Sequence, residues 1–220
     1  FRHEEEHAGQ EREVFQMGAE WIGPGQSQAD VEMITLAIEI LQALKIKSFR
    51  IVLGQVAFTR GILTPFQERP ILFRQILSCV SRKETSRLET LLKEAKAGAR
   101  LKKQVLALPS LYGGEAVFKK AASLTEDPLC LAPLKQLSEV YHLLTQKKGV
   151  QEHLLIDLGE VRGFDYYTGM IFEIFADSIG MELGGGGRYD HLSGKFGASD
   201  PAIGFALNIE RIERVKEQGS

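Results

Sequence analysis

The sequence predicts an α+β fold, in which a mostly antiparallel sheet is flanked by helices and interrupted by a helical insertion. Short apolar runs typical of strands lie towards both ends of the 220-residue chain, whereas residues 65–148 show almost only helical periodicity. The expected elements follow one another as strand, helix, strand, helical insertion and further strands. Doubly wound nucleotide-binding folds instead alternate strand and helix regularly, so that class is not expected.

The strands expected before the insertion are short and bounded by turn residues. Residues 14–22 alternate loosely between apolar and polar side chains, which predicts a strand that ends at Gly23-Pro24-Gly25. Residues 2–13 are polar, with a glycine among them, and predict a loop. Residues 49–53 predict a second strand.

One helix is expected between these strands, over residues 27–44. Its apolar side chains recur at helical spacing, at Val31, Ile34, Ile38 and Leu41. Ser27 or Asp30 is expected to cap its start, because a short polar side chain accepts a bond from a free N–H group there. The acidic residues of this helix are expected to face water: Asp30, Glu32 and Glu39.

The insertion divides the chain into a first core part, 1–64, the helical insertion, 65–148, and a second core part, 149–220. Strands are expected in the second part at 154–157, 170–175 and 202–206, with a closing helix at 208–217. Within the insertion, residues 82–103 carry eight basic and three acidic residues. This basic stretch favours a solvated helical face over a surface for RNA or an acidic partner.

Composition is that of an ordinary globular protein, with 44% hydrophobic and 25% charged residues and a net charge of −2. This charge argues against a protein that coats nucleic acid. No apolar run is long enough to cross a membrane. Cys79 and Cys130 match no metal-binding spacing, so we expect neither a metal nor a cofactor, and a cytoplasmic location. The chain begins at Phe1, and we expect further residues before it in the natural protein.

The glycine-rich stretch LGGGGRYDHLSGKFG, residues 183–197, raises the question of a phosphate-binding loop. A Walker-type loop requires Ser or Thr after its lysine, where this chain has Phe196, and the surrounding pattern supplies no βαβ unit for a dinucleotide. Glycines also allow a ligand to lie against a strand, beside the charge, ring and acceptor of Arg188, Tyr189 and Asp190. On glycine content alone, a flexible hairpin tip is equally consistent.

A second cluster favours a pocket. VRGFDYYTG, residues 161–169, places an arginine, an aspartate and two tyrosines between two predicted strands. Aromatic rings beside a guanidinium suit a small planar ligand that carries a carboxylate.

Four segments together resemble the histidyl form of the class II aminoacyl-tRNA synthetases. They are FRHEEEHAGQEREVFQMGAEWIG, VRGFDYYTGMIFE, GGGGRYDHL and PAIGFALNIER, which stand in the family's order and resemble its motif 2, its two histidine-site segments and its motif 3. With LGQVAFTRGIL, residues 53–63, the chain is also similar to a branch of that family, the regulatory subunits of ATP phosphoribosyltransferase. This resemblance implies the class II synthetase-like sheet and a chain that has lost aminoacylation.

The branch also implies partners. Such a chain would activate the short-form catalytic subunit of ATP phosphoribosyltransferase in the first step of histidine biosynthesis and would mediate feedback inhibition by free histidine. It would form a homo-oligomer within a hetero-oligomer and would have no tRNA or membrane partner.

On the ATP side, the resemblance implies a vestigial site and no catalytic residue. Arg2 matches the motif 2 arginine that grips the α-phosphate, Glu4 the glutamate after it, and Arg211 the motif 3 arginine that would hold the γ-phosphate. Gln10 stands where a further arginine would help to hold ATP, and the loop carries several glutamates: Glu4, Glu5, Glu6 and Glu11. Each such charge near the ATP anion costs on the order of 1 kcal/mol, which argues against ATP binding.

On the amino-acid side, this sequence matches the family's histidine-site residues more closely. Gln16 and Glu20 match the polar residues of the motif 2 strand that meet the amino acid, and Arg162 matches the arginine that assists activation in the synthetase. The tyrosines around the imidazole match Tyr166, Tyr167 and Tyr189. Gly186 is expected in the glycine floor. The alternative function is the catalytic core of a histidyl-tRNA synthetase, and an orphan paralogue that modifies another protein is a third.

Overall fold

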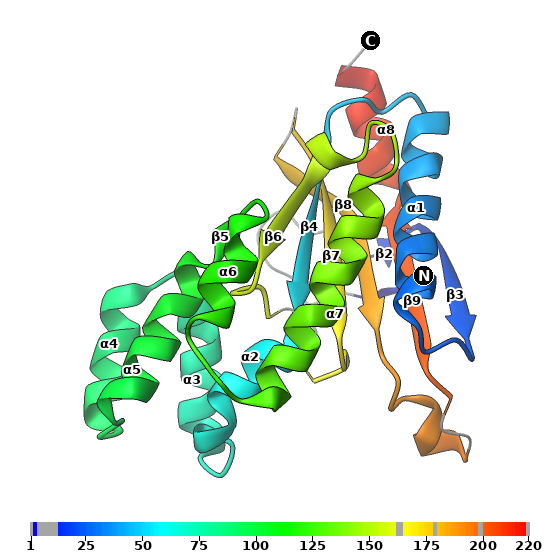
Figure 1. Ribbon diagram of the computed structural model, residues 1–220. Coiled ribbons are helices and arrows are strands. Elements are labelled where there is room, and N and C mark those ends of the chain that lie inside the picture. Colours follow the sequence, from blue (N-terminus) through cyan, green and yellow to red (C-terminus); the bar gives the residue numbers. More distant parts are fainter. Residues whose placement is uncertain (1, 4–12, 162–164, 178–179, 198–199, 219–220) are drawn as a thin grey trace.

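The computed structural model describes residues 2–3, 13–161, 165–177, 180–197 and 200–218 (Figure 1). A seven-stranded sheet forms its centre, in the order β3-β9-β8-β7-β4-β6-β5. Every neighbouring pair is antiparallel except β4 with β6, so the predicted mostly antiparallel sheet is confirmed. The strands are β3 (Gln16–Ile22), β4 (Phe49–Gln55), β5 (Tyr112–Gly113), β6 (Leu154–Asp157), β7 (Met170–Ala176), β8 (Met181–Arg188) and β9 (Ala202–Asn208).

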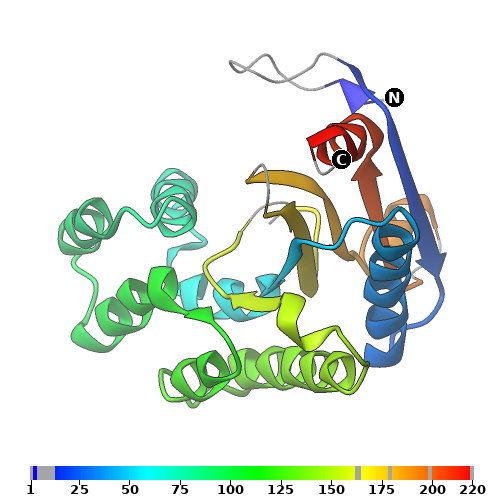
Figure 2. The ribbon, with the colours of Figure 1, turned by 90° about the horizontal axis from the view of Figure 1, so that it is seen from above.

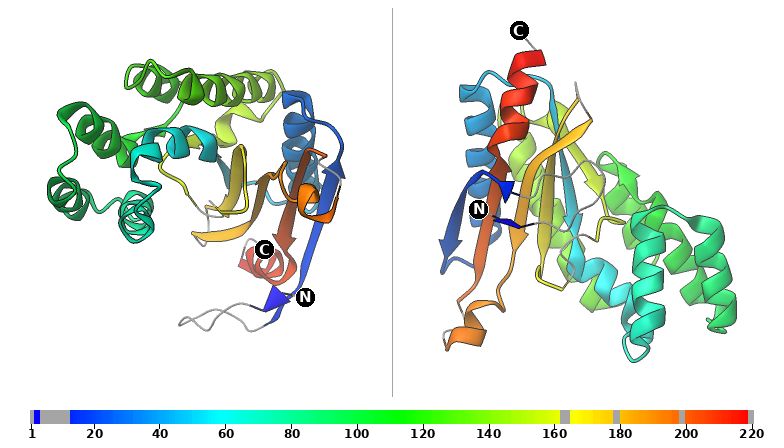
Figure 3. Two further views of the ribbon diagram at one scale, coloured as in Figure 1. Left: turned by 90° about the horizontal axis from the view of Figure 1, so that it is seen from below. Right: turned by 180° about the vertical axis from the view of Figure 1, so that it is seen from behind.

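Two long helices cover one face of the sheet. Figure 2 shows α1 (Ser27–Ala43) and α7 (Pro128–Thr145) side by side along that face, while α8 (Ile209–Gln218) lies on the other side. The view from behind in Figure 3 shows that, among the described elements, the second face has no helix layer comparable to α1 and α7. We call this second face, on which Glu20 lies, the open face.

The helical insertion extends from one end of the sheet. It contains α3 (Pro70–Ser81), α4 (Thr85–Glu94), α5 (Ala99–Ala107), α6 (Ala116–Ala122) and α7, and it follows α2 (Val56–Leu63). In the described connections there are four short 3₁₀ helices: Thr64–Phe66, Leu108–Ser110, Gln151–His153 and Ser193–Phe196. The insertion also supplies β5, which pairs with β6. One continuous cluster of buried side chains joins the sheet to the insertion.

The polar loop expected over residues 2–13 differs from the structure at both ends. β1 (Arg2–His3) pairs with β2 (Glu13–Val14) as a small separate sheet. Three of the four paired residues are polar, which is possible because antiparallel backbone hydrogen bonds need no apolar side chain.

The start of α1 also differs from the prediction. Neither expected cap is used: the residue before the helix, Gln26, makes no side-chain cap bond, and the Ser27 hydroxyl donates to Glu139 at 3.1 Å. Asp30, expected to face water, is 6% exposed. Its carboxylate accepts a 2.9 Å hydrogen bond from Nε of Arg188, so the charge is buried because it is paired.

Candidate functional site

The sheet register separates the predicted pocket residues between two faces. Paired residues of antiparallel strands share a face, and alternate residues along a strand lie on opposite faces. Glu20 pairs with Gly204, Gly204 with Gly187, and Gly187 with Ile171, so these four residues form one row across the sheet. Gln16 lies four residues before Glu20 on the exposed edge strand β3 and therefore shares the open face.

Glu20 and Tyr189 meet at this row. The phenol of Tyr189 donates a short hydrogen bond to Oε2 of Glu20. Tyr189 follows β8 directly, and its N–H donates to the Ala202 carbonyl at 2.8 Å, which continues the β8–β9 ladder by one residue. A Cβ atom on Gly204 would overlap the Glu20 carboxylate. Glycine at 204 therefore lets the carboxylate lie across β9 towards the tyrosine.

Three tyrosines form one aromatic cluster above that row. Tyr166 stacks on Tyr189 with ring centroids 4.9 Å apart and planes 27° apart, and meets Tyr167 edge-on at 4.9 Å. Burial, followed by the Glu20 carboxylate, raises the pKa of both Tyr166 and Tyr189. Both phenols therefore stay protonated at neutral pH and act as hydrogen-bond donors. Stacked rings beside a carboxylate suit a flat ligand with N–H groups.

The glycine run has a structural reason of its own. It is not a hairpin tip but the middle of β8, between β7 and β9. Gly186 pairs with Phe205 and Phe172 on the helix-covered face, and a Cβ on it would lie 2.6 Å from Cβ of Phe205. Its neighbours Gly185 and Gly187 lie on the open face with Glu20. The expected floor at Gly186 is therefore one residue out of phase with the side chains that face the pocket.

Arg188 does not stand beside the pocket floor, where a charge was expected. Its side chain is 9% exposed and points to the helix-covered face, as the alternation along β8 requires. Besides Asp30, it donates to Asp190 at 3.1 Å and to the Pro24 carbonyl at 3.1 Å. Arg188 thus joins β8 to the start of α1. Asp190 shares this network and accepts a 3.1 Å bond from the Ala202 N–H.

The residues expected on the ATP side are not brought together with this cluster by any contact among the described residues. Arg2 belongs to β1, and Glu4 lies outside the described residues. Arg162, which was expected on the amino-acid side, also lies outside them. Arg211 is on α8, where its guanidinium donates to the Glu182 carbonyl at 2.9 Å. Among the described residues no group of His, Cys, Asp and Glu side chains fits a metal ion.

Sequence reasoning missed two polar residues next to the tyrosines. Nη2 of Arg60 on α2 donates to the Tyr167 carbonyl at 3.2 Å. The hydroxyl of Thr168 accepts a hydrogen bond from the Asp190 N–H at 3.0 Å. This bond ties residues 165–169, which we call the tyrosine segment, to the end of β8. The only signal for Arg60 was its place in the LGQVAFTRGIL segment.

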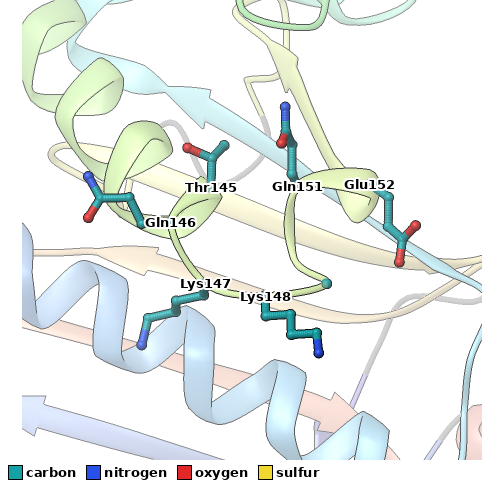
Figure 4. Close-up of a pocket in the computed structure, with 7 residues that line it drawn as sticks. Thr145, Gln146, Lys147, Lys148, Gln151 and Glu152 are labelled. Atoms are coloured by element: carbon teal, nitrogen blue, oxygen red, sulfur yellow. The ribbon is translucent and has the colours of Figure 1, made fainter.

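A surface pocket of about 650 Å³ lies elsewhere, at the end of α7. Its lining residues come from one short stretch, 145–152, and Figure 4 shows their labelled side chains pointing away from one another. Neither Glu20 nor any of the three clustered tyrosines lines this pocket, so it is not the candidate site.

Comparison with known proteins matches this chain and its fold to one family. The family model described as histidyl-tRNA synthetase matches residues 1–212. A solved structure from Bacillus halodurans, described as an ATP phosphoribosyltransferase regulatory subunit/histidyl-tRNA synthetase, is 28% identical with a TM-score of 0.85. The match covers 94% of this chain and 54% of that one.

Two curated relatives are both named ATP phosphoribosyltransferase regulatory subunit. The protein from Geobacter sulfurreducens is 39% identical over 208 residues, or 94% of this chain and 47% of the relative. The protein from Moorella thermoacetica is 39% identical over 212 residues, or 96% of this chain and 54% of the relative. The chain thus spans about half the length of the relatives it matches. Within the part that the structure describes, no helix has the length and apolar character needed to cross a membrane.

Proposed function

This chain belongs to the histidyl-tRNA synthetase family, and we propose that it serves there as the non-catalytic regulatory subunit of ATP phosphoribosyltransferase. In this role it activates a separate short-form catalytic subunit in the first step of histidine biosynthesis. Free histidine binds to it and reverses the activation. The observation that carries the proposal is the 39% identity, over nearly the whole chain, to relatives named as such subunits.

The open face supports histidine as the effector. In this proposal the imidazole lies against the Tyr166–Tyr189 stack, and the Glu20 carboxylate accepts a hydrogen bond from a ring N–H group. Tyr167 borders the ring. Gln16, on the same strand and face as Glu20, contributes polar contacts from the strand's start.

Two further parts of the binding site follow from the family pattern and the register. Arg162, outside the described residues, matches the family's arginine beside the amino acid and is proposed to bind the ligand too. Gly185 and Gly187, on either side of Gly186, leave the floor free of side chains on the open face. A ligand can then lie directly on the β8 backbone.

The ATP side supports a regulator rather than a synthetase. Gln10 replaces a cationic contact, and several glutamates share the motif 2 loop. Arg211 is engaged with a backbone carbonyl. We propose that the ancestral nucleotide site is vestigial, which leaves an amino-acid pocket without activation chemistry. A sensor needs no more than that.

Assembly and location form part of the proposal. The chain is proposed to act as a homo-oligomer within a hetero-oligomer with the catalytic subunit, in the cytoplasm, without tRNA or a membrane as partner. The catalytic core of a histidyl-tRNA synthetase is the second candidate. The retained Arg162 and Arg211 favour it, as does the double description of the Bacillus halodurans structure.

The test uses the full-length protein and a separately purified short catalytic subunit. The two are mixed with ATP and phosphoribosyl pyrophosphate, and formation of phosphoribosyl-ATP is followed with and without histidine. We expect the regulatory chain to raise the rate and histidine to reverse the gain. A rate that this chain leaves untouched, together with histidine charging of tRNA by the chain alone, would replace the proposal with the synthetase function.

A further inference from the structure

The connection between β6 and β7 carries Tyr166 and Tyr167. Helix α2 donates hydrogen bonds to three carbonyl groups of the described parts of this connection. At its start, the Thr59 hydroxyl donates to the Leu158 carbonyl at 2.7 Å. At its end, the Val56 N–H donates to the Gly169 carbonyl at 3.0 Å. Between them, Arg60 donates to the Tyr167 carbonyl. All three donors belong to the first turns of α2.

α2 is itself fixed against the helical insertion. Gln55, 1% exposed, precedes it and caps it, since its Oε1 accepts the Ala57 N–H at 3.2 Å. Nε2 of the same side chain donates to the Pro133 carbonyl of α7 at 3.1 Å. Further along the same helix, Gly61 lies so close to α7 that a Cβ atom there would be 2.6 Å from Sγ of Cys130. α2 therefore lies between α7 and the tyrosine segment and contacts both.

Of these three donors, Arg60 is the one whose acceptor, the Tyr167 carbonyl, belongs to a tyrosine of the cluster. Burial lowers the pKa of Arg60, and the Asp165 carboxylate opposes that shift. An arginine nevertheless remains a cation in proteins, so its bond to the Tyr167 carbonyl is charge-assisted and stronger than a neutral one. This carbonyl belongs to Tyr167, the residue that directly follows Tyr166 in the sequence. The Tyr166 ring in turn stacks on Tyr189.

We infer that Arg60 is a positioning residue of the proposed histidine site: it holds the Tyr167 carbonyl and so fixes the Tyr166 and Tyr167 rings opposite Tyr189 and Glu20. This inference rests on the proposed function, because it assigns a role within the same site. Arg60 acts on the ligand through the two tyrosines. Through Gln55 and Gly61, the same helix sets the tyrosine segment at a defined place relative to α7.

Calorimetry with two ligands separates positioning from direct contact. The full-length protein and its Arg60→Gln variant are titrated with histidine and with histidinol, which has no carboxylate. A positioning role predicts that both ligands weaken by the same factor, roughly 3- to 30-fold, because the aromatic part of the site is displaced. Direct contact with the ligand carboxylate predicts a loss for histidine alone, which would overturn the inference.

Two further variants complete the test. Arg60→Lys keeps the charge but lacks the planar fork, and we expect it to restore part of the affinity for both ligands. Arg82→Gln removes an arginine whose side chain is 73% exposed, and we expect both affinities to stay unchanged. Should Arg60→Gln fail to fold in a thermal unfolding scan, Arg60→Lys decides, and wild-type affinity in that variant overturns the inference.

The inference and the proposed function fail in different ways. If the wild-type protein binds neither ligand, the proposed histidine site itself is wrong. If the wild-type protein binds histidine and Arg60→Gln binds it equally well, the site stands and the positioning role of Arg60 is wrong.

Discussion

The phenol of Tyr189 and the carboxylate of Glu20 are joined by a hydrogen bond across strand β9, although 169 positions separate them in the sequence. Gly204 of β9 lies between them and offers no side chain in the way. The bond orients the one carboxylate that we place against the histidine ring. The pair therefore links the motif 2 strand to the glycine-rich strand at the proposed ligand.

Replacing Tyr189 by Phe should weaken histidine binding by about 1–2 kcal/mol, since Glu20 loses a charge-assisted donor. Burial and the Glu20 charge raise the pKa of Tyr189, so the phenol keeps its proton through neutral and mildly alkaline solution. The difference between wild type and variant should hence be the same at pH 7 and pH 9. Calorimetry measures both, with Tyr112→Phe, an exposed tyrosine on β5, as the matched control. Equal affinities in Tyr189→Phe and wild type would remove this pair from the site.

Gly186→Ala should lower the free energy of unfolding by about 1–3 kcal/mol, because the new methyl group meets β9 and Phe205 on the covered face. Gly98→Ala is the control: no atom lies within 4 Å of the added Cβ atom, and φ is −66°. We expect the free energy of unfolding of that variant to lie within a few tenths of a kcal/mol of the wild-type value, or slightly above it. Urea denaturation gives both values. A Gly186→Ala protein of wild-type stability that has lost histidine binding would instead return Gly186 to the ligand floor.

Arg188→Met should destabilise the fold by about 3–5 kcal/mol, since it leaves the Asp30 carboxylate buried without its cation. Arg50→Met is the matched control, because the Arg50 side chain is 46% exposed and pairs with Asp177 at the surface. An exposed pair of that kind contributes about 0–1 kcal/mol. Thermal or urea unfolding distinguishes the two effects. Similar small losses in both variants would show that water reaches Asp30 and that the pair is not a structural link.

The elements that hydrophobic periodicity marks were predictable from the sequence, and those defined by distant partners were not. The strands at 49–53 and 202–206 have apolar runs, and the structure places β4 and β9 there. β8 has four glycines and no side-chain alternation, so it is recognisable as a strand only from the backbones on either side. Asp30 looked like a solvated helix residue because Arg188, which allows its burial, lies 158 positions away.

The candidate site shows the same division. Tyr166, Tyr167 and Tyr189 were expected together from their motifs, and the structure brings their rings into contact. Their role in binding histidine stays a prediction. The face on which each glycine lies was not predictable, since one step in register exchanges the two faces of a strand. Arg60 was missed because one arginine in a short helix reads as a surface residue until its acceptor, a backbone carbonyl far along the chain, is located.

The full-length protein should not form the histidyl adenylate: it should show no histidine-dependent ATP–pyrophosphate exchange and should not charge tRNA. The reaction needs cationic donors around the α-phosphate as negative charge develops in the transition state. Gln10 supplies no charge where the family has an arginine, and the guanidinium of Arg211 is 2.9 Å from the Glu182 carbonyl. Loss of one such contact costs on the order of 2–4 kcal/mol, or roughly 30- to 1,000-fold in rate, and the loop glutamates add repulsion. A bacterial histidyl-tRNA synthetase assayed in parallel is the positive control. Exchange at a rate comparable with that control would mean that ATP is held by groups other than these, and the synthetase function would then replace the regulatory one.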